Sequence, residues 1–102
     1  MKIFKELKKL GYIHYSATTI EELDDLPLNS AERISEQALV LRWFREKYGL
    51  IPTIRPFSKG ETFFFSIIGE DEDFTSGSKE FTYEEAELEC LVKLIEIVKE
   101  KS

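Results

Sequence analysis

Cationic and aromatic side chains gather in the middle of the chain, and they are the first candidates for binding chemistry. Arg42, Arg45 and Arg55 carry guanidinium groups, which bind phosphate oxygens through paired hydrogen bonds, and Lys47 and Lys59 add two ammonium groups to the same stretch. Trp43 beside them offers a flat ring on which a base can stack. This cluster of cations and its neighbouring aromatic ring therefore predict a site for a small phosphate-bearing ligand. The alternative is ordinary surface charge, with Glu46 as an ion-pair partner on the same helix.

No set of catalytic residues accompanies this cluster. His14, the single histidine, lies in a predicted strand with no nucleophile at a recognisable spacing, so we expect a structural role. Cys90, the single cysteine, falls on the flank of an apolar helix face, where a buried and inert thiol is expected. One Cys and one His also exclude a Cys/His zinc site within one chain. We therefore expect no catalytic residue, cofactor or metal, and a protein that is not an enzyme.

An acidic loop contains the beginning of a calcium-binding pattern. Asp71, Asp73 and Thr75 alternate as the first three ligands of such a loop would. The sixth position, which requires glycine, is Ser76, and the twelfth, which requires glutamate, is Thr82. A solvated loop is therefore expected here rather than a metal site.

Size and charge narrow the class of protein. The chain has 102 residues, which suffice for a single domain spanning residues 1–102 with one core. Its formal net charge of −6 opposes binding to nucleic-acid phosphates and to anionic membranes. The basic start is not followed by the apolar core of a signal peptide, and no stretch has membrane-spanning length. We expect a cytoplasmic protein that binds neither nucleic acid nor membrane.

Two long helices have the clearest boundaries. The first is expected over residues 31–48, between an Asn-Ser cap and Gly49, which favours helix termination. The second is expected over residues 82–99. It opens with Thr82-Tyr83-Glu84-Glu85, the spacing of a capping box, in which the first and fourth residues bond each other's backbone amides.

A small antiparallel sheet is predicted between these helices. A hairpin is expected over residues 50–69, and Glu80 and Phe81 are expected to add a short third strand. The fold class is therefore α+β. Residues 30–102 form a helix–strand–strand–strand–helix core in which two long helices pack on the sheet.

An N-terminal extension, residues 1–28, precedes this core. Residues 1–10 are predicted to form a short amphipathic helix, and Tyr12–Ala17 to form a strand. Thr18 and Thr19 each precede a glutamate by three residues, which predicts a short capped helix after them.

Apolar residues of the first long helix fall on two faces. The expected core face carries five residues at helical spacing: Ile34, Ala38, Leu41, Phe44 and Tyr48. Leu39 and Trp43 lie almost opposite, where a helix at the edge of a small domain should be polar. This second patch is therefore expected to be covered, either by residues 1–28 or by a second chain.

The second hairpin strand is also apolar on both faces. Phe63, Phe65 and Ile67 point one way, whereas Phe64 and Ile68 point the other. A sheet with one solvated face alternates cleanly between apolar and polar residues. Both faces of the sheet are therefore expected to be covered, by the N-terminal extension or by a second subunit.

The order of elements over residues 31–99 resembles that of the double-stranded-RNA-binding domain. The stretch Ser76-Gly77-Ser78-Lys79 also looks like that family's approach to its second helix. The family binds phosphate through a basic cluster at the start of that helix, where this chain has Thr82-Tyr83-Glu84-Glu85. The resemblance therefore implies the topology and no binding of RNA.

A second resemblance is to small uncharacterised proteins of phages and mobile elements of gut-type bacteria. It is carried by Trp43-Phe44-Arg45-Glu46-Lys47-Tyr48-Gly49, by Thr82-Tyr83-Glu84-Glu85-Ala86-Glu87 with Cys90-Leu91, and by Leu94-Ile95-Glu96-Ile97-Val98-Lys99. It implies an accessory role in a phage-infected bacterium and implies no reaction.

These patterns together predict a non-enzymatic binding or interaction protein that forms a homo-oligomer or binds a protein partner. Its expected partner- or ligand-binding residues are Leu39, Arg42, Trp43, Arg45 and Arg55. One alternative is a small-molecule-binding protein that sequesters a nucleotide signal. Another is a decoy inhibitor that presents its acidic surface to a nucleic-acid-binding enzyme.

Overall fold

The protein has an α+β fold, as the sequence predicts. The computed structural model describes residues 2–14, 18–57 and 60–101. Four helices and three strands follow one another along these residues: α1 (Ile3–Lys9), α2 (Ile20–Asp25), α3 (Ala31–Tyr48), β1 (Ile51–Pro56), β2 (Phe63–Ile68), β3 (Asp73–Thr75) and α4 (Tyr83–Lys101). The predicted helix–strand–strand–strand–helix order from α3 to α4 is confirmed.

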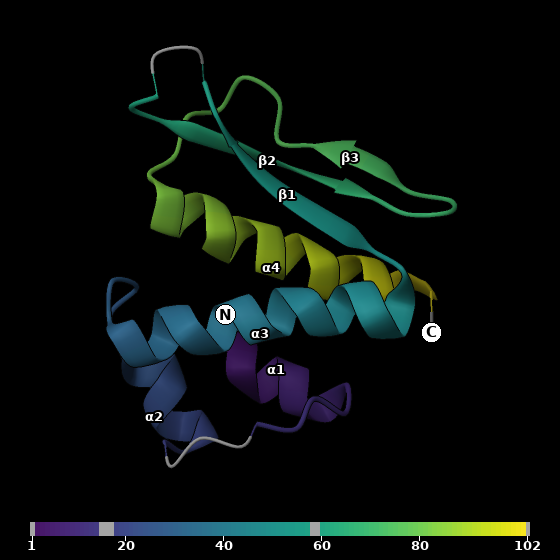
Figure 1. Cartoon of the computed structure of the whole chain (residues 1–102). Helices are drawn as coiled ribbons and strands as arrows, with labels where there is room; N and C mark the ends of the chain where they lie inside the picture. Colours follow the sequence, from purple (N-terminus) through teal and green to yellow (C-terminus); the bar gives the residue numbers. More distant parts are fainter. Residues whose placement is uncertain (1, 15–17, 58–59, 102) are drawn as a thin grey trace.

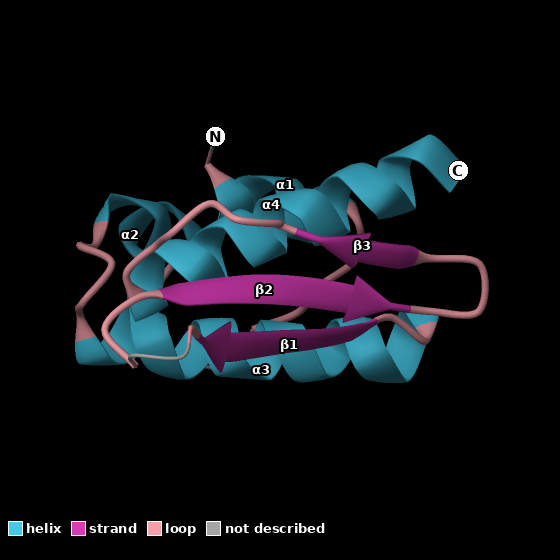
Figure 2. Cartoon of the chain, turned by 90° about the horizontal axis from the view of Figure 1, so that it is seen from above, coloured by secondary structure: helices cyan, strands magenta, loops and turns pink. Residues whose placement is uncertain are grey.

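The elements form three layers. The strands make an antiparallel sheet in the order β1-β2-β3, and α3 and α4 lie side by side against one face of it (Figures 1 and 2). The short helices α1 and α2 lie on the far side of these two helices (Figure 1). The two long helices are therefore the middle layer, with the sheet on one side and the N-terminal helices on the other.

Local capping chemistry sets both ends of α3 and the start of α4 where the sequence predicts them, whereas α4 runs to Lys101, two residues beyond its predicted end. The Ser30 hydroxyl accepts a hydrogen bond from the Arg33 amide at 3.4 Å and so caps the first turn of α3. Gly49 ends α3 with a φ of +67°, a left-handed conformation that glycine adopts without strain. Thr82 and Glu85 bond each other's backbone amides at 3.2 and 2.9 Å, so the predicted capping box of α4 is confirmed.

The third strand lies elsewhere than predicted. It is Asp73–Thr75, inside the stretch expected to be a solvated loop, and it pairs with the end of β2. Phe81 makes only an isolated bridge, to Phe63 at the other end of β2. The physical reason is the Phe74 side chain, which packs against the core from the same side as Phe65. One apolar anchor is enough to fix this strand among acidic neighbours.

The N-terminal extension does not cover the outer face of the sheet, so that alternative of the prediction is wrong, and cover by a second subunit stays a prediction. Phe65 and Ile67 of β2 point into the core and are buried. Ile51 and Ile68 lie opposite each other on the outer face, where 46% and 49% of their surfaces are exposed. No element of the described ranges covers this face (Figure 2).

Prolines protect the free edge of β1. The Phe57 amide donates to the Thr62 carbonyl at 2.9 Å across the hairpin. Because amides alternate along a strand, the outward-facing positions are Pro52, Ile54 and Pro56. Two of these three positions have no N–H group, so this edge has a single outward amide to donate and pairs poorly with another strand.

The N-terminal extension packs within its own chain. Ile3, Phe4 and Leu7 of α1 are fully buried in the common core, and α1 contacts α4. The second apolar side of α4 is therefore covered by α1, which explains the wide apolar arc of that helix. Residues 12–14 of the predicted strand Tyr12–Ala17 form no strand, and residues 15–17 lie outside the described ranges. Gly11 turns the chain out of α1 with a φ of +100°.

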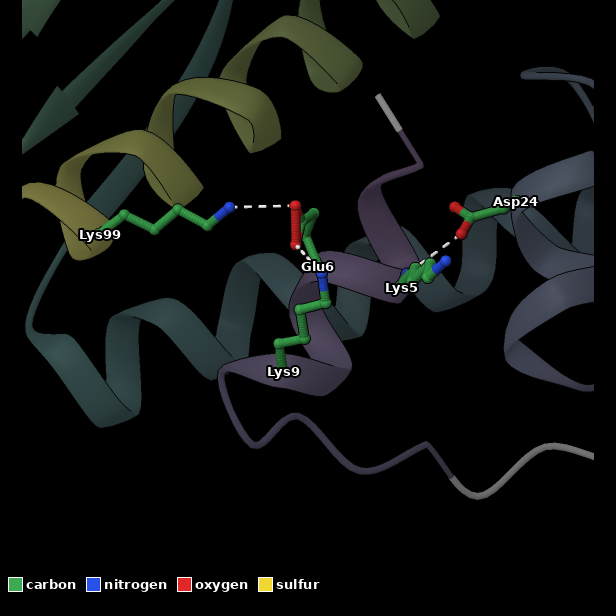
Figure 3. Close-up of polar contacts among 5 residues, drawn as sticks. All are labelled: Lys5, Glu6, Lys9, Asp24 and Lys99. Atoms are coloured by element: carbon green, nitrogen blue, oxygen red, sulfur yellow. Dashed lines mark hydrogen bonds and ion pairs between the residues drawn. The ribbon is translucent and has the colours of Figure 1, made fainter.

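Polar contacts tie the first turn of α1 to α2 and to α4 (Figure 3). The Asp24 carboxylate, at the end of α2, accepts the amides of Phe4 and Lys5 at 2.9 and 3.0 Å and so caps α1 from a distance. Lys99 of α4 donates to Glu6 of α1 at 3.0 Å, joining residues 93 positions apart. The predicted cap of α2 is confirmed at Thr19, whose hydroxyl accepts a hydrogen bond from the Glu22 amide at 3.1 Å.

Candidate functional site

The buried face of α3 is turned relative to the predicted one. Its buried residues are Arg33, Glu36, Gln37, Val40 and Phe44. Of the predicted core stripe, Phe44 is buried and Leu41 and Tyr48 are half-buried, whereas Ala38 is exposed and Ile34 has 37% of its surface exposed. The cause is that α3 lies between two layers and must bury two sides, so polar residues that find partners enter the core in place of Ile34.

Trp43 is half-buried by contacts within the chain. Its ring meets Tyr12 edge-on at 5.4 Å, and it meets Phe44 and Tyr48 at 5.0 and 5.5 Å. The Lys47 ammonium lies 5.1 Å from the centre of the Trp43 ring. The N-terminal extension therefore covers part of the second apolar patch of α3. Cover by residues 1–28 was one of the two predicted alternatives; the other was cover by a second chain.

Leu39 is not covered. More than half of its surface, 54%, is exposed, and Ile13 in the segment after α1 is 66% exposed. Both residues line a surface groove of about 510 Å³ beside the outer side of α3. We call it the α3 groove; its lining residues are Tyr12, Ile13, Glu36, Leu39, Arg42, Trp43 and Glu46. Three of the five predicted site residues, Leu39, Arg42 and Trp43, therefore meet in one place.

The charges of the α3 groove are already paired. Arg42 donates to Glu46 at 3.1 Å, and both side chains are exposed. At the inner wall the Tyr12 hydroxyl donates to the buried Glu36 carboxylate. Burial raises the pKa of the Tyr12 phenol, and the Glu36 carboxylate adds to the rise, so this hydroxyl stays protonated. The groove thus has an apolar floor, a fixed polar wall and one ion pair at its rim.

The remaining predicted cations lie in other places. Arg45 shares a smaller hollow of about 210 Å³ with Arg42, on the side of α3 that faces Pro52. Arg55 lies opposite Phe64 on the outer face of the sheet. The three arginines therefore do not form one cluster. Lys59, which the sequence groups with them, lies outside the described residues.

A buried polar chain links three helices, and sequence patterns did not predict it. Arg33 donates from Nε to the Gln37 side-chain oxygen at 2.9 Å, and Gln37 donates to Glu87 of α4 at 2.7 Å. Arg33 also donates to the carbonyls of Asp24 and Leu26 at 3.3 and 2.8 Å. We call Arg33, Gln37 and Glu87 the buried relay. The signal in the sequence was three polar residues at positions that the helical period places near the core, but their partners are up to 50 residues away.

Burial dominates the electrostatics of the relay at Glu87. It raises the pKa of the Glu87 carboxyl, and the hydrogen bond from Gln37 opposes this only in part. Cys90, one turn further along α4, is fully buried, and burial followed by the nearby Glu87 charge raises the pKa of its thiol to about 12. A thiol in this state is a poor nucleophile at neutral pH, in keeping with the inert thiol predicted.

The other chemical candidates have structural surroundings. The His14 ring bonds the Thr18 carbonyl through Nε2 at 2.8 Å, which ties the segment after α1 to the start of α2. Asp73 and Thr75 of the calcium-like pattern lie in β3. Across residues 2–14, 18–57 and 60–101, no three His, Cys, Asp or Glu side chains come together in a way that would hold a metal ion.

Comparisons with known proteins assign this chain to no family. No family model matches the chain, and no curated protein or solved structure matches it. In the part of the chain that the structure describes, every helix is too short or too polar to span a bilayer.

Proposed function

We propose that this protein is a non-enzymatic interaction module that binds a protein partner in the α3 groove, and that the partner is a second copy of the chain. The observation that carries the proposal is the pair Ile13 and Leu39, exposed side by side on a groove of about 510 Å³. Large apolar side chains grouped around a hollow are a common feature of docking surfaces, where an aromatic or aliphatic anchor fills the hollow.

A protein partner fits the groove better than a nucleotide does. Arg42, the one cation lining it, is held by Glu46 at 3.1 Å, and Glu36 adds a second carboxylate. A phosphate group would meet two carboxylates for one guanidinium, which is unfavourable. A second copy brings Leu39 and Ile13 as anchors, and its own Arg42–Glu46 pair offers both signs of charge at the rim, as a self-complementary interface requires.

The free edge of the sheet supports the same choice of surface. Pro52 and Pro56 disfavour strand pairing through β1, so a side-chain surface such as the α3 groove is a better site for self-association than this edge. The setting we propose is the cytoplasm of a phage-infected bacterium, where the resemblance described above implies an accessory role. The formal net charge of −6 supports a partner that is a protein rather than a nucleic acid.

A second candidate is capture of a nucleotide signal by Arg42 and Arg45. The observation in its favour is the hollow of about 210 Å³ that these two arginines line without a carboxylate among its lining residues. It predicts that a nucleotide raises the melting temperature and that Arg45→Gln removes this effect, while Leu39→Asp leaves it unchanged.

The test of the main proposal is the mass of the protein in solution. Light scattering after size-exclusion chromatography, at about 200 μM, detects any dimer with a micromolar dissociation constant. We expect a dimer for the wild type and a monomer for Leu39→Asp, because a charge replaces an anchor that becomes buried in the interface.

The matched control is Ile34→Asp. Ile34 lies on the same helix and is partly exposed at 37%, but it does not line the α3 groove. This variant should remain a dimer. A monomeric wild type, or equal dissociation of the two variants, would refute a second copy as the partner in this groove.

A further inference from the structure

A second groove lies where three helices end. The last residues of α1 and α4, the end of α3 and the start of the following strand surround a hollow of about 560 Å³. We call it the helix-end groove; its lining residues are Lys9, Leu10, Tyr48, Leu50, Ile97, Val98 and Lys101. None of these residues lines the α3 groove, and the volume falls within the range of sites for small molecules.

The helix-end groove is lined by five apolar or aromatic residues and by two lysines. Leu50, Ile97 and Val98 are buried core residues, and Leu10 and Tyr48 pack against the same core. They offer an apolar floor to which a hydrocarbon chain can bind by leaving water. Only two charged residues line the groove, Lys9 and Lys101, and both are lysines.

Helix ends would normally make such a place negative, because carbonyl groups point out of the last turn. Two of those carbonyls, one at the end of α3 and one after α1, have partners. The amide of Gly49 bonds the Arg45 carbonyl at 3.1 Å, and the Lys47 ammonium lies 3.5 Å from the Leu10 carbonyl, within donating distance. These two carbonyls therefore add less negative charge to the groove than open helix ends would.

The charge of the groove contrasts with the charge of the chain. The formal net charge is −6, whereas the lining of this groove contains two cations and no carboxylate. Lys9 pairs with Glu6 at 3.5 Å and Lys101 with Glu72 at 3.2 Å. The lysine side chains of the two pairs are 64% and 50% exposed, whereas the Glu6 and Glu72 side chains are 22% and 27% exposed. Water screens the lysine end of each pair, so a carboxylate ligand competes with a partly screened ion pair.

We propose that the helix-end groove binds a small amphipathic carboxylate with a single hydrocarbon chain. The chain lies on the floor of Leu10, Leu50 and Val98, and the carboxylate accepts hydrogen bonds from Lys9 and Lys101 at the rim. The proposal is independent of the α3 groove, because the two sites share no lining residue.

The test compares decanoate with decanol, which has the same chain length and no charge. Isothermal titration calorimetry on the wild-type protein should show decanoate binding below its micelle concentration, and decanol binding at least about tenfold more weakly. Lys9→Gln combined with Lys101→Gln should weaken decanoate by about tenfold and leave decanol unchanged. Glu72→Gln, which frees Lys101, should strengthen decanoate binding by about two- to threefold.

The matched control is Lys93→Gln. Lys93 also lies on α4 and pairs with Glu96 at 3.7 Å, but it does not line the groove, so decanoate should bind this variant as it binds the wild type. Three results would overturn the proposal: no heat with decanoate, equal affinity for decanoate and decanol, or loss of decanoate binding in Lys93→Gln equal to that in the double lysine variant.

Discussion

Replacing Gln37 with leucine tests whether the buried relay holds the three layers together. Gln37 is 1% exposed, and its amide group serves two charged partners at once, accepting from Arg33 at 2.9 Å and donating to Glu87 at 2.7 Å. Leucine fills much of the same space but removes both hydrogen bonds. Arg33 keeps its bonds to two carbonyls at the end of α2, whereas the Glu87 oxygen that Gln37 bonded is left without that donor in a buried place.

The expected cost follows from these contacts. Hydrogen bonds to charged groups contribute about 1.5–3 kcal/mol each, and an uncompensated buried charge adds to the loss, so Gln37→Leu should lower the free energy of unfolding by about 3–5 kcal/mol. A domain of this size has about 5–15 kcal/mol in total. The melting temperature, followed by circular dichroism, should fall by at least about 12 °C.

A double-mutant cycle separates the relay from simple loss of packing. Gln37→Leu combined with Glu87→Leu removes the stranded carboxylate, so the pair should cost about 1–3 kcal/mol less than the sum of the single changes. Ser35→Ala, an exposed change on the same helix, serves as control and should stay within about 0.5 kcal/mol of the wild type. A Gln37→Leu protein that melts like this control would show that the relay contributes nothing to stability.

Three further predictions concern α4. Thr82→Ala should cost about 0.5–2 kcal/mol in thermal unfolding, and Thr82→Ala with Glu85→Ala should cost less than the sum of the singles; additive costs would contradict the reciprocal capping bonds. The native state keeps the proton of Glu87 to higher pH than the unfolded chain does, so the contribution of Glu87 to stability falls as pH rises from the ordinary carboxyl pKa of 4.5 to the raised value. Glu87→Gln should therefore gain more over the wild type at pH 7 than at about pH 4, and an equal difference at both would refute a raised pKa. Cys90 should not react with iodoacetamide at pH 8 until the protein is unfolded by urea, because its thiol is buried with a pKa of about 12; labelling of the folded protein within minutes would contradict this.

Local signals were enough to predict the long helices and the hairpin. Ser30, Gly49 and the Thr82–Glu85 pair act through residues three or four positions away, so their chemistry can be recognised in the sequence. The α+β class followed from these boundaries and from the two strands between them. The position of the third strand did not follow, because Phe74 is a single apolar residue among acids and only the core that it contacts selects it.

The predicted grouping of the site residues was likewise correct where they are close along one helix and wrong where the contact depends on the rest of the fold. Leu39, Arg42 and Trp43 lie within one turn or so of a helix, and the helical period brings them together whatever the rest of the fold does. Arg55 was grouped with them by closeness along the sequence, but strand alternation places it on the other side of the sheet from α3. Ile13 was missed as a lining residue because it reaches the groove through the turn at Gly11, which no periodic pattern encodes.

The contact between α1 and α4 sets the order in which the domain can be completed during its synthesis. α1 leaves the ribosome before every other described element, yet Ile3, Phe4 and Leu7 complete a core to which α4 contributes, and Glu6 pairs with Lys99. A helix of seven residues has little stability alone in water, so α1 has to wait, unfolded, until α4 emerges. From the synthesis of α1 until α4 emerges, the nascent chain therefore carries an exposed apolar segment, and a chain arrested before α4 would present that segment to chaperones and proteases.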